Sequence, residues 1–122
     1  MGLRVLLVED EALVSMLIEE YLEELGCEVA GVASRLEDAV EKARTLALDA
    51  AVVDVNLAGR LSYPVAEALR ARGVPVVFAT GYGTTGLPAN LHGAAVLCKP
   101  FQQEQLAKAL CEARGARCLV PG

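Results

Sequence analysis

The sequence predicts an α/β fold in which helices cover both faces of a parallel β-sheet. Short, almost continuous apolar runs alternate with longer amphipathic segments along the 122 residues. Such runs are typical of strands buried on both faces of a parallel sheet, and strands that alternate with helices form right-handed βαβ units. The length and a hydrophobic fraction of 54% indicate one domain with a substantial core.

The first elements follow from the spacing of apolar residues. Residues 3–8 form an apolar run and are expected to be the first strand, and residues 28–33 the second. Residues 11–25 between them show helical spacing, and Gly26 stands where a C-cap glycine belongs. One apolar stripe of this helix is expected to comprise Leu13, Leu17, Tyr21 and Leu25, with Val14, Ile18 and Leu22 beside it. Its solvated face is expected to carry Glu19, Glu20, Glu23 and Glu24.

The middle of the chain continues the alternation. Ser34 and Glu37 have the spacing of a capping box, which predicts a helix from residue 34 to about residue 46. The run at residues 50–53 predicts the third strand. After a loop, Pro64 is well placed in the first turn of a helix that ends near residue 72.

The last third of the chain completes five strands. Residues 74–79 and 94–98 predict strands, and residues 102–114 predict the last helix. A stretch rich in Gly, Thr, Pro and Asn lies between the two strands and predicts only a short helix at residues 87–91. At this size the expected architecture is a flavodoxin-like, doubly wound sheet with strand order 2-1-3-4-5, which binds ligands beyond the carboxyl ends of its strands.

Composition excludes several classes of protein. The chain has 11 basic and 16 acidic residues and a net charge of −5, which argues against nucleic acid as a partner. No apolar run is long enough to cross a membrane or to form a signal peptide, so we expect a cytoplasmic location. The four cysteines show no CxxC spacing, and His92 is the single histidine, so a zinc site is not expected. The cysteines are expected to be buried or incidental thiols: Cys27, Cys98, Cys111 and Cys118.

Polar residues stand at the carboxyl ends of four predicted strands. Glu9 and Asp10 follow the first strand and Asp54 the third; these two strands are neighbours in the expected sheet, so the carboxylates should converge. Three close carboxylates repel one another unless a cation lies among them, and Mg²⁺ is the hard divalent ion that such ligands favour. Thr80 and Lys99 end the fourth and fifth strands. Carboxylate, metal, hydroxyl and ammonium together predict phosphoryl transfer, with Asp54 as nucleophile.

These motifs resemble those of the receiver domains of two-component response regulators, which have the CheY-like form of this fold. The resemblance covers essentially the whole chain and rests on Leu7-Val8-Glu9-Asp10-Glu11, Val52-Val53-Asp54-Val55-Asn56, Ala79-Thr80-Gly81 and Lys99-Pro100-Phe101. It implies that a histidine kinase phosphorylates Asp54. It also implies that Glu9, Asp10, Asp54 and the backbone carbonyl of Asn56 bind Mg²⁺, with Mn²⁺ as an alternative. Thr80 would be the switch hydroxyl, Lys99 the phosphate-binding lysine, and Lys99-Pro100 a cis peptide.

Two positions depart from the common receiver pattern. Val96 replaces the usual aromatic residue, and Ala58 replaces a usual proline, which puts the common threonine–aromatic switch in doubt. The run Phe78-Ala79-Thr80-Gly81-Tyr82 is similar to the "FAT GUY" subgroup, whose members are often receivers alone and are associated with HWE-class kinases. The subgroup resemblance gives a functional interpretation to the glycine-rich segment that follows Thr80. We expect Gly81, Tyr82 and Gly83 to form a switch loop.

The expected function is that of a single receiver domain over residues 1–122 with no output domain. It would signal by protein contact or pass its phosphoryl group to a phosphotransfer protein, as a monomer or a weak phosphorylation-dependent dimer, and catalyse only its own phosphorylation and dephosphorylation. Three alternatives remain open: an aspartate phosphatase of the haloacid dehalogenase type, a pseudo-receiver that only binds partners, and a receiver excised from a hybrid histidine kinase. Asn56 counts against the phosphatase, which would need an aspartate there.

Overall fold

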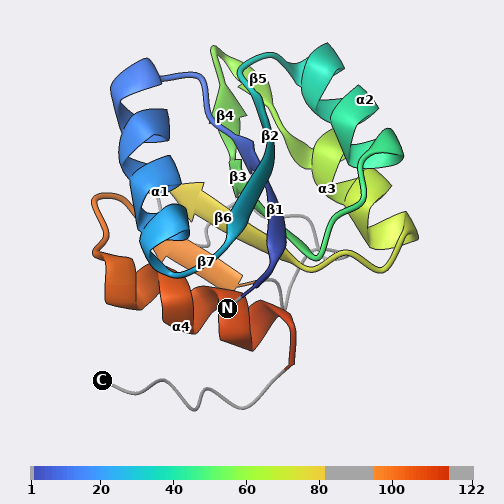
Figure 1. Ribbon diagram of the computed structural model, residues 1–122. Coiled ribbons are helices and arrows are strands. Elements are labelled where there is room, and N and C mark those ends of the chain that lie inside the picture. The colour runs from blue at the N-terminus through green and yellow to red at the C-terminus, as the bar shows by residue number, and fades with distance from the viewer. Residues whose placement is uncertain (1, 82–94, 116–122) are drawn as a thin grey trace.

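The computed structural model describes residues 2–81 and 95–115 and confirms the predicted α/β architecture (Figure 1). Five parallel strands form one sheet in the order β2-β1-β3-β6-β7, which is the predicted order 2-1-3-4-5. The strands of this sheet are β1 (Arg4–Val8), β2 (Glu28–Ala33), β3 (Ala50–Asp54), β6 (Val76–Thr80) and β7 (Ala95–Cys98). The helices are α1 (Ala12–Glu24), α2 (Leu36–Thr45), α3 (Tyr63–Ala71) and α4 (Gln103–Ala113).

Helices cover both faces of the sheet, and each face has its own apolar core. In Figure 1, α1 and α4 lie on one side and α2 and α3 on the other. Successive residues of a strand point to opposite faces, so Leu7 joins the core beneath α1 and α4, whereas Leu6 and Val8 join the core beneath α2 and α3. All five residues of β3 are buried. Each large apolar side chain buried in this way contributes about 1.5–3 kcal/mol to stability.

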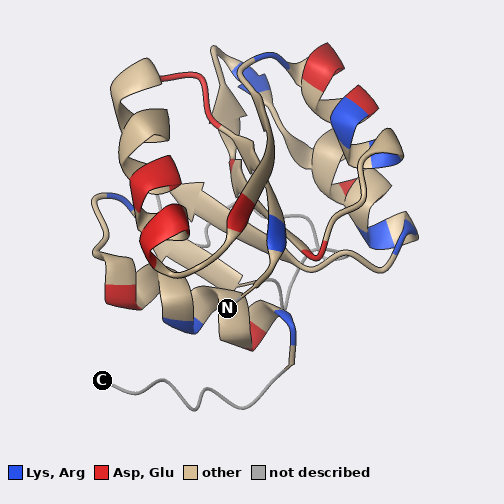
Figure 2. Cartoon of the chain, in the orientation of Figure 1, with Lys and Arg blue, Asp and Glu red and all other residues tan. Residues whose placement is uncertain are grey.

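The orientation of α1 differs from the prediction. The helix packs on the sheet through Ile18 and Leu22, with Val14 beside them, whereas Leu13 is 81% exposed and Leu17 is also exposed. The stripe expected to face the core is therefore wrong at Leu13 and Leu17, because the helix is rotated so that its second apolar row faces the sheet. Three of the four glutamates of α1 are exposed as expected, whereas Glu19 is half-buried; Figure 2 colours the acidic residues of the helix red.

The start of α2 is a second correction. The helix begins at Leu36, and Arg35 holds the N-cap position without a side-chain hydrogen bond. Glu37 is then only the second helical residue, too early to reach back to the N-cap amide, and it forms an ion pair with Arg60 instead. The predicted capping box of Ser34 and Glu37 is wrong for this reason.

The remaining differences are local. Residues 56–61 form a small antiparallel hairpin, β4 (Asn56–Leu57) and β5 (Arg60–Leu61), where a loop was expected. The helix predicted at residues 87–91, together with Tyr82, Gly83, His92 and Cys118, lies outside the described residues. Among the described residues, no helix has the length and apolar character that a membrane crossing requires.

The thiols provide a test of the packing of β2. Cys27 is buried and Cys98 is exposed, and burial raises the pKa of the Cys27 thiol because its thiolate would lose hydration. We expect iodoacetamide at about pH 8 to alkylate Cys98 at least about tenfold faster than Cys27 in the native protein. Peptide mass spectrometry over time measures both rates, and a denatured sample is the control in which they converge. Equal rates in the native protein would contradict the burial of Cys27.

Candidate functional site

The predicted site residues meet at one edge of the sheet. Glu9 follows β1, Asp54 ends β3, Thr80 ends β6 and Lys99 follows β7, so four strands deliver one side chain each to the carboxyl edge. The parallel pairing of β1 with β3, in which Val8 lies opposite Val53, brings the first two close together. The convergence predicted from the strand order is thus present.

Three carboxylates form the centre of the site. One oxygen each of Glu9, Asp10 and Asp54 lies within 4.8 Å of the others. Glu9 is 1% exposed and Asp54 is 7% exposed, while Asp10 is half-buried and borders a pocket of about 400 Å³. The negative charges of Glu9 and Asp54 are therefore held where little water can screen them.

Lys99 supplies the positive charge that faces this cluster. Its Nζ lies 2.8 Å from Glu9 Oε2 and 3.1 Å from Asp54 Oδ2. Burial lowers the pKa of Lys99, but the hydrogen bonds to these two carboxylates outweigh that effect, and the net pKa is raised. Burial raises the pKa of Glu9 to about 6 despite the neighbouring ammonium. Lys99 is therefore a cation at neutral pH and ties β7 to β1 and β3.

The donor set fits a hard divalent cation. One ammonium faces three carboxylates, so negative charge remains uncompensated in a largely buried site. All three side chains offer oxygen atoms, which are the ligands that Mg²⁺ prefers. Asn56 also lines the pocket.

The β4–β5 hairpin forms one wall of this pocket and was missed by sequence reasoning. The Asn56 N–H donates to Asp54 Oδ1 over 3.3 Å, and the Ala58 N–H donates to Asp10 Oδ2 over 3.0 Å. Ala58 and Gly59 line the pocket as well. The dipeptide Ala58-Gly59 is a weak turn signal, because hairpin turns more often begin with Asn, Asp or Gly.

The switch residues are placed only in part. Thr80 is buried at the end of β6, and its backbone carbonyl accepts a hydrogen bond from the Lys99 N–H. Gly81 is exposed and borders the pocket. Val96, the position that lacks the usual aromatic residue, packs against the core beneath α2 and α3. The Lys99-Pro100 peptide is cis, as the resemblance implied.

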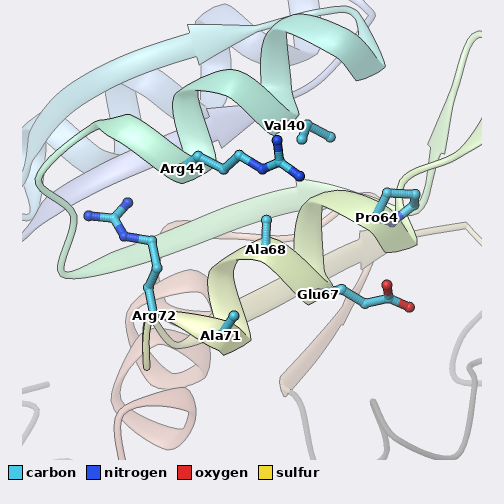
Figure 3. A pocket seen from close by; sticks show the side chains of 7 residues that line it. All are labelled: Val40, Arg44, Pro64, Glu67, Ala68, Ala71 and Arg72. Carbon is cyan, nitrogen blue, oxygen red and sulfur yellow. The ribbon is translucent and has the colours of Figure 1, made fainter.

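A larger groove of about 480 Å³ lies elsewhere, between α2 and α3 (Figure 3). Its lining combines small apolar side chains such as Ala68 and Ala71 with Arg44 and Arg72, and Glu67 is its one acidic residue. This groove lacks the grouped carboxylates of the strand-end pocket. The strand-end pocket is therefore the better candidate for phosphoryl chemistry.

Comparisons with known proteins agree with this geometry. The response regulator receiver domain family matches residues 5–111. The transcriptional regulatory protein PdtaR of Mycobacterium tuberculosis is 33% identical over 111 residues, which cover 88% of this chain and 54% of PdtaR. The chain thus spans about half the length of that relative.

Two solved structures extend the comparison. SdrG from Sphingomonas melonis has a TM-score of 0.81 and 40% identity, with 92% of this chain and 96% of SdrG covered. The receiver domain of the sensor histidine kinase PA1611 from Pseudomonas aeruginosa has a TM-score of 0.79 and 27% identity, covering 95% of this chain and 100% of that one. In that structure a magnesium ion is coordinated in the active-site cleft.

These matches do not favour the haloacid dehalogenase alternative. The family match over residues 5–111 includes the strand-end residues Glu9, Asp10, Asp54, Thr80 and Lys99. The chain belongs to the response regulator receiver domain family.

Proposed function

We propose that this receiver accepts a phosphoryl group from a histidine kinase on Asp54. The observation that carries the proposal is the meeting of Glu9, Asp10 and Asp54 within 4.8 Å, with the Lys99 ammonium bonded to two of them. A buried carboxylate beside a fixed cation is suited to attack on phosphorus, because charge developing on the phosphoryl oxygens meets a positive group already in place.

Each site residue has a distinct role in the transfer of the phosphoryl group to Asp54. A carboxylate oxygen of Asp54 forms the new O–P bond while the P–N bond of the kinase phosphohistidine breaks, and the electron pair stays on the imidazole. Lys99 holds the incoming phosphoryl oxygens, and the Thr80 hydroxyl donates a hydrogen bond to the bound group. The carboxylates of Glu9, Asp10 and Asp54 and the backbone carbonyl of Asn56 would hold Mg²⁺, or Mn²⁺ in its place. When bound, the ion supplies positive charge to the oxygens of the phosphoryl group.

The output is proposed to run through protein contact. Membership of the receiver family supports signalling by contact with a downstream protein or by onward phosphotransfer. The sequence Phe78-Ala79-Thr80-Gly81-Tyr82 supports membership of the FAT GUY subgroup and, with it, a kinase of the HWE class. Gly81, with Tyr82 and Gly83, would form the switch loop, which changes conformation when the Thr80 hydroxyl bonds the phosphoryl group.

A labelling experiment on the wild-type protein tests the proposal. We expect acetyl phosphate with Mg²⁺ to add one phosphoryl group per chain, and omission of the metal with EDTA present to lower the labelling rate by more than about 100-fold. Intact-mass spectrometry follows the rate, and peptide mapping locates the group at Asp54. The adduct should be stable in acid and hydrolysed in base, as an acyl phosphate is.

Other outcomes would argue against the proposal. Steady turnover of phosphate esters without an adduct would indicate a phosphatase. Equal labelling with and without metal would contradict the assignment of the carboxylate cluster. Calcium in place of magnesium is a useful control, because the larger ion prefers six to eight oxygen ligands at longer distances.

A further inference from the structure

The β4–β5 hairpin places its turn beside the carboxylate cluster. Asn56 pairs with Leu61 and Leu57 with Arg60, so Ala58 and Gly59 form a two-residue turn between two-residue strands. Both turn residues have positive φ, 51° at Ala58 and 89° at Gly59, as a type I′ turn requires. An alanine is uncommon in this conformation, whereas glycine adopts it freely.

Several contacts fix this turn in place. Leu57 is 2% exposed and belongs to the core beneath α2 and α3. The Gly59 N–H donates to Asn56 Oδ1 over 2.7 Å, and the Ser62 N–H donates to the Val55 carbonyl over 2.9 Å. Arg60 forms an ion pair with Glu37 of α2. The backbone amide of residue 58 is therefore a donor with a defined direction.

That amide donates to Asp10 Oδ2 over 3.0 Å. Asp10 lies between β1 and α1 and is half-buried, so its side chain would otherwise have rotational freedom. We propose that the hairpin positions the Asp10 carboxylate for cation binding through the main-chain N–H of Ala58. Ala58 is thus a positioning residue, and this role rests on the proposed function of the site.

A pair of variants separates the amide from the side chain. Ala58→Pro introduces the residue that is usual in receivers at this position, but in this hairpin it removes the N–H and cannot adopt a φ of 51°, whereas Ala58→Gly keeps the N–H and suits that φ. We expect calorimetric titration with Mg²⁺ to show about tenfold weaker binding for Ala58→Pro, as for other groups that orient metal ligands, and wild-type affinity for Ala58→Gly. Circular dichroism establishes that each variant is folded before titration.

A second measurement needs neither the proline variant nor a metal. In the metal-free protein, Asp10→Ala should speed hydrogen exchange of the Ala58 amide by about tenfold, the worth of one hydrogen bond. The Gly59 amide should keep its rate because its acceptor is Asn56. If Ala58→Pro fails to fold, this exchange measurement decides the question.

The results that overturn the inference are distinct from those that overturn the proposed function. Wild-type Mg²⁺ affinity in folded Ala58→Pro, equal loss in Ala58→Gly, or unchanged exchange at Ala58 in Asp10→Ala would each refute the positioning role. A wild-type protein that binds no Mg²⁺ would instead refute the proposed cation site itself.

Discussion

Replacing Asp54 with asparagine is expected to lower phosphorylation by acetyl phosphate and Mg²⁺ by more than about a thousandfold, as removal of a nucleophile does in other covalent mechanisms. The amide lacks the negative charge and the nucleophilic oxygen of the carboxylate, and Lys99 loses the anionic partner that lies 3.1 Å away. Intact-mass spectrometry at a series of times measures the labelled fraction directly.

The matched control is Asp38→Asn. Asp38 is an exposed carboxylate of α2 that pairs with Lys42 and does not line the strand-end pocket, so its variant should label like wild type. Circular dichroism should show both variants folded, because neither substitution changes a side-chain volume in the core. Labelling of Asp54→Asn at the wild-type rate would mean that another group accepts the phosphoryl group and that the proposed role of Asp54 is wrong.

Replacing Phe78 with alanine is expected to lower the free energy of unfolding by about 3–5 kcal/mol. Phe78 is 0% exposed in the middle of β6, and its ring meets that of Tyr63 edge-on, with centroids 6.3 Å apart. The substitution removes the transfer free energy of the ring and leaves a cavity that its neighbours fill only in part. Since domains are stable by about 5–15 kcal/mol, this loss is a large share of the total.

Urea unfolding followed by circular dichroism measures this change. Leu13→Ala is the matched control, because it also shortens a large apolar side chain, but one that is 81% exposed on α1. Its expected effect is within about 0.5 kcal/mol. A loss at Leu13 as large as at Phe78 would show that α1 packs through its other apolar row and would contradict the helix orientation described above.

The sheet and the strand-end residues could be predicted because each depends on a local signal. A buried parallel strand appears as a short apolar run, and the residue after it must lie at the carboxyl edge whatever the details of packing. Strand order then brings Glu9 and Asp54 together without further information. The predicted cation site needed only these steps and the chemistry of carboxylates.

The parts that could not be predicted depend on packing between elements. Leu17 and Ile18 belong to adjacent rows of the same helix, and the sheet decides which row faces inward. The capping-box spacing predicts that Glu37 caps α2. Because α2 begins at Leu36, Glu37 is only its second residue, and its carboxylate forms an ion pair with Arg60 of the hairpin instead. The hairpin itself has two-residue strands, too short for an alternating pattern to appear in the sequence.

The sequence separation of the site residues has a consequence for folding. Lys99 lies 90 residues from Glu9 and 45 from Asp54, yet it bonds to both. Contacts at such separations form only once the intervening chain is ordered, so a partly folded chain that contains α1 and β2 has the acidic residues without their counter-ion. The site can therefore accept a phosphoryl group only in a chain whose sheet is complete. The fraction of a preparation that becomes phosphorylated is then a measure of the fraction of native molecules.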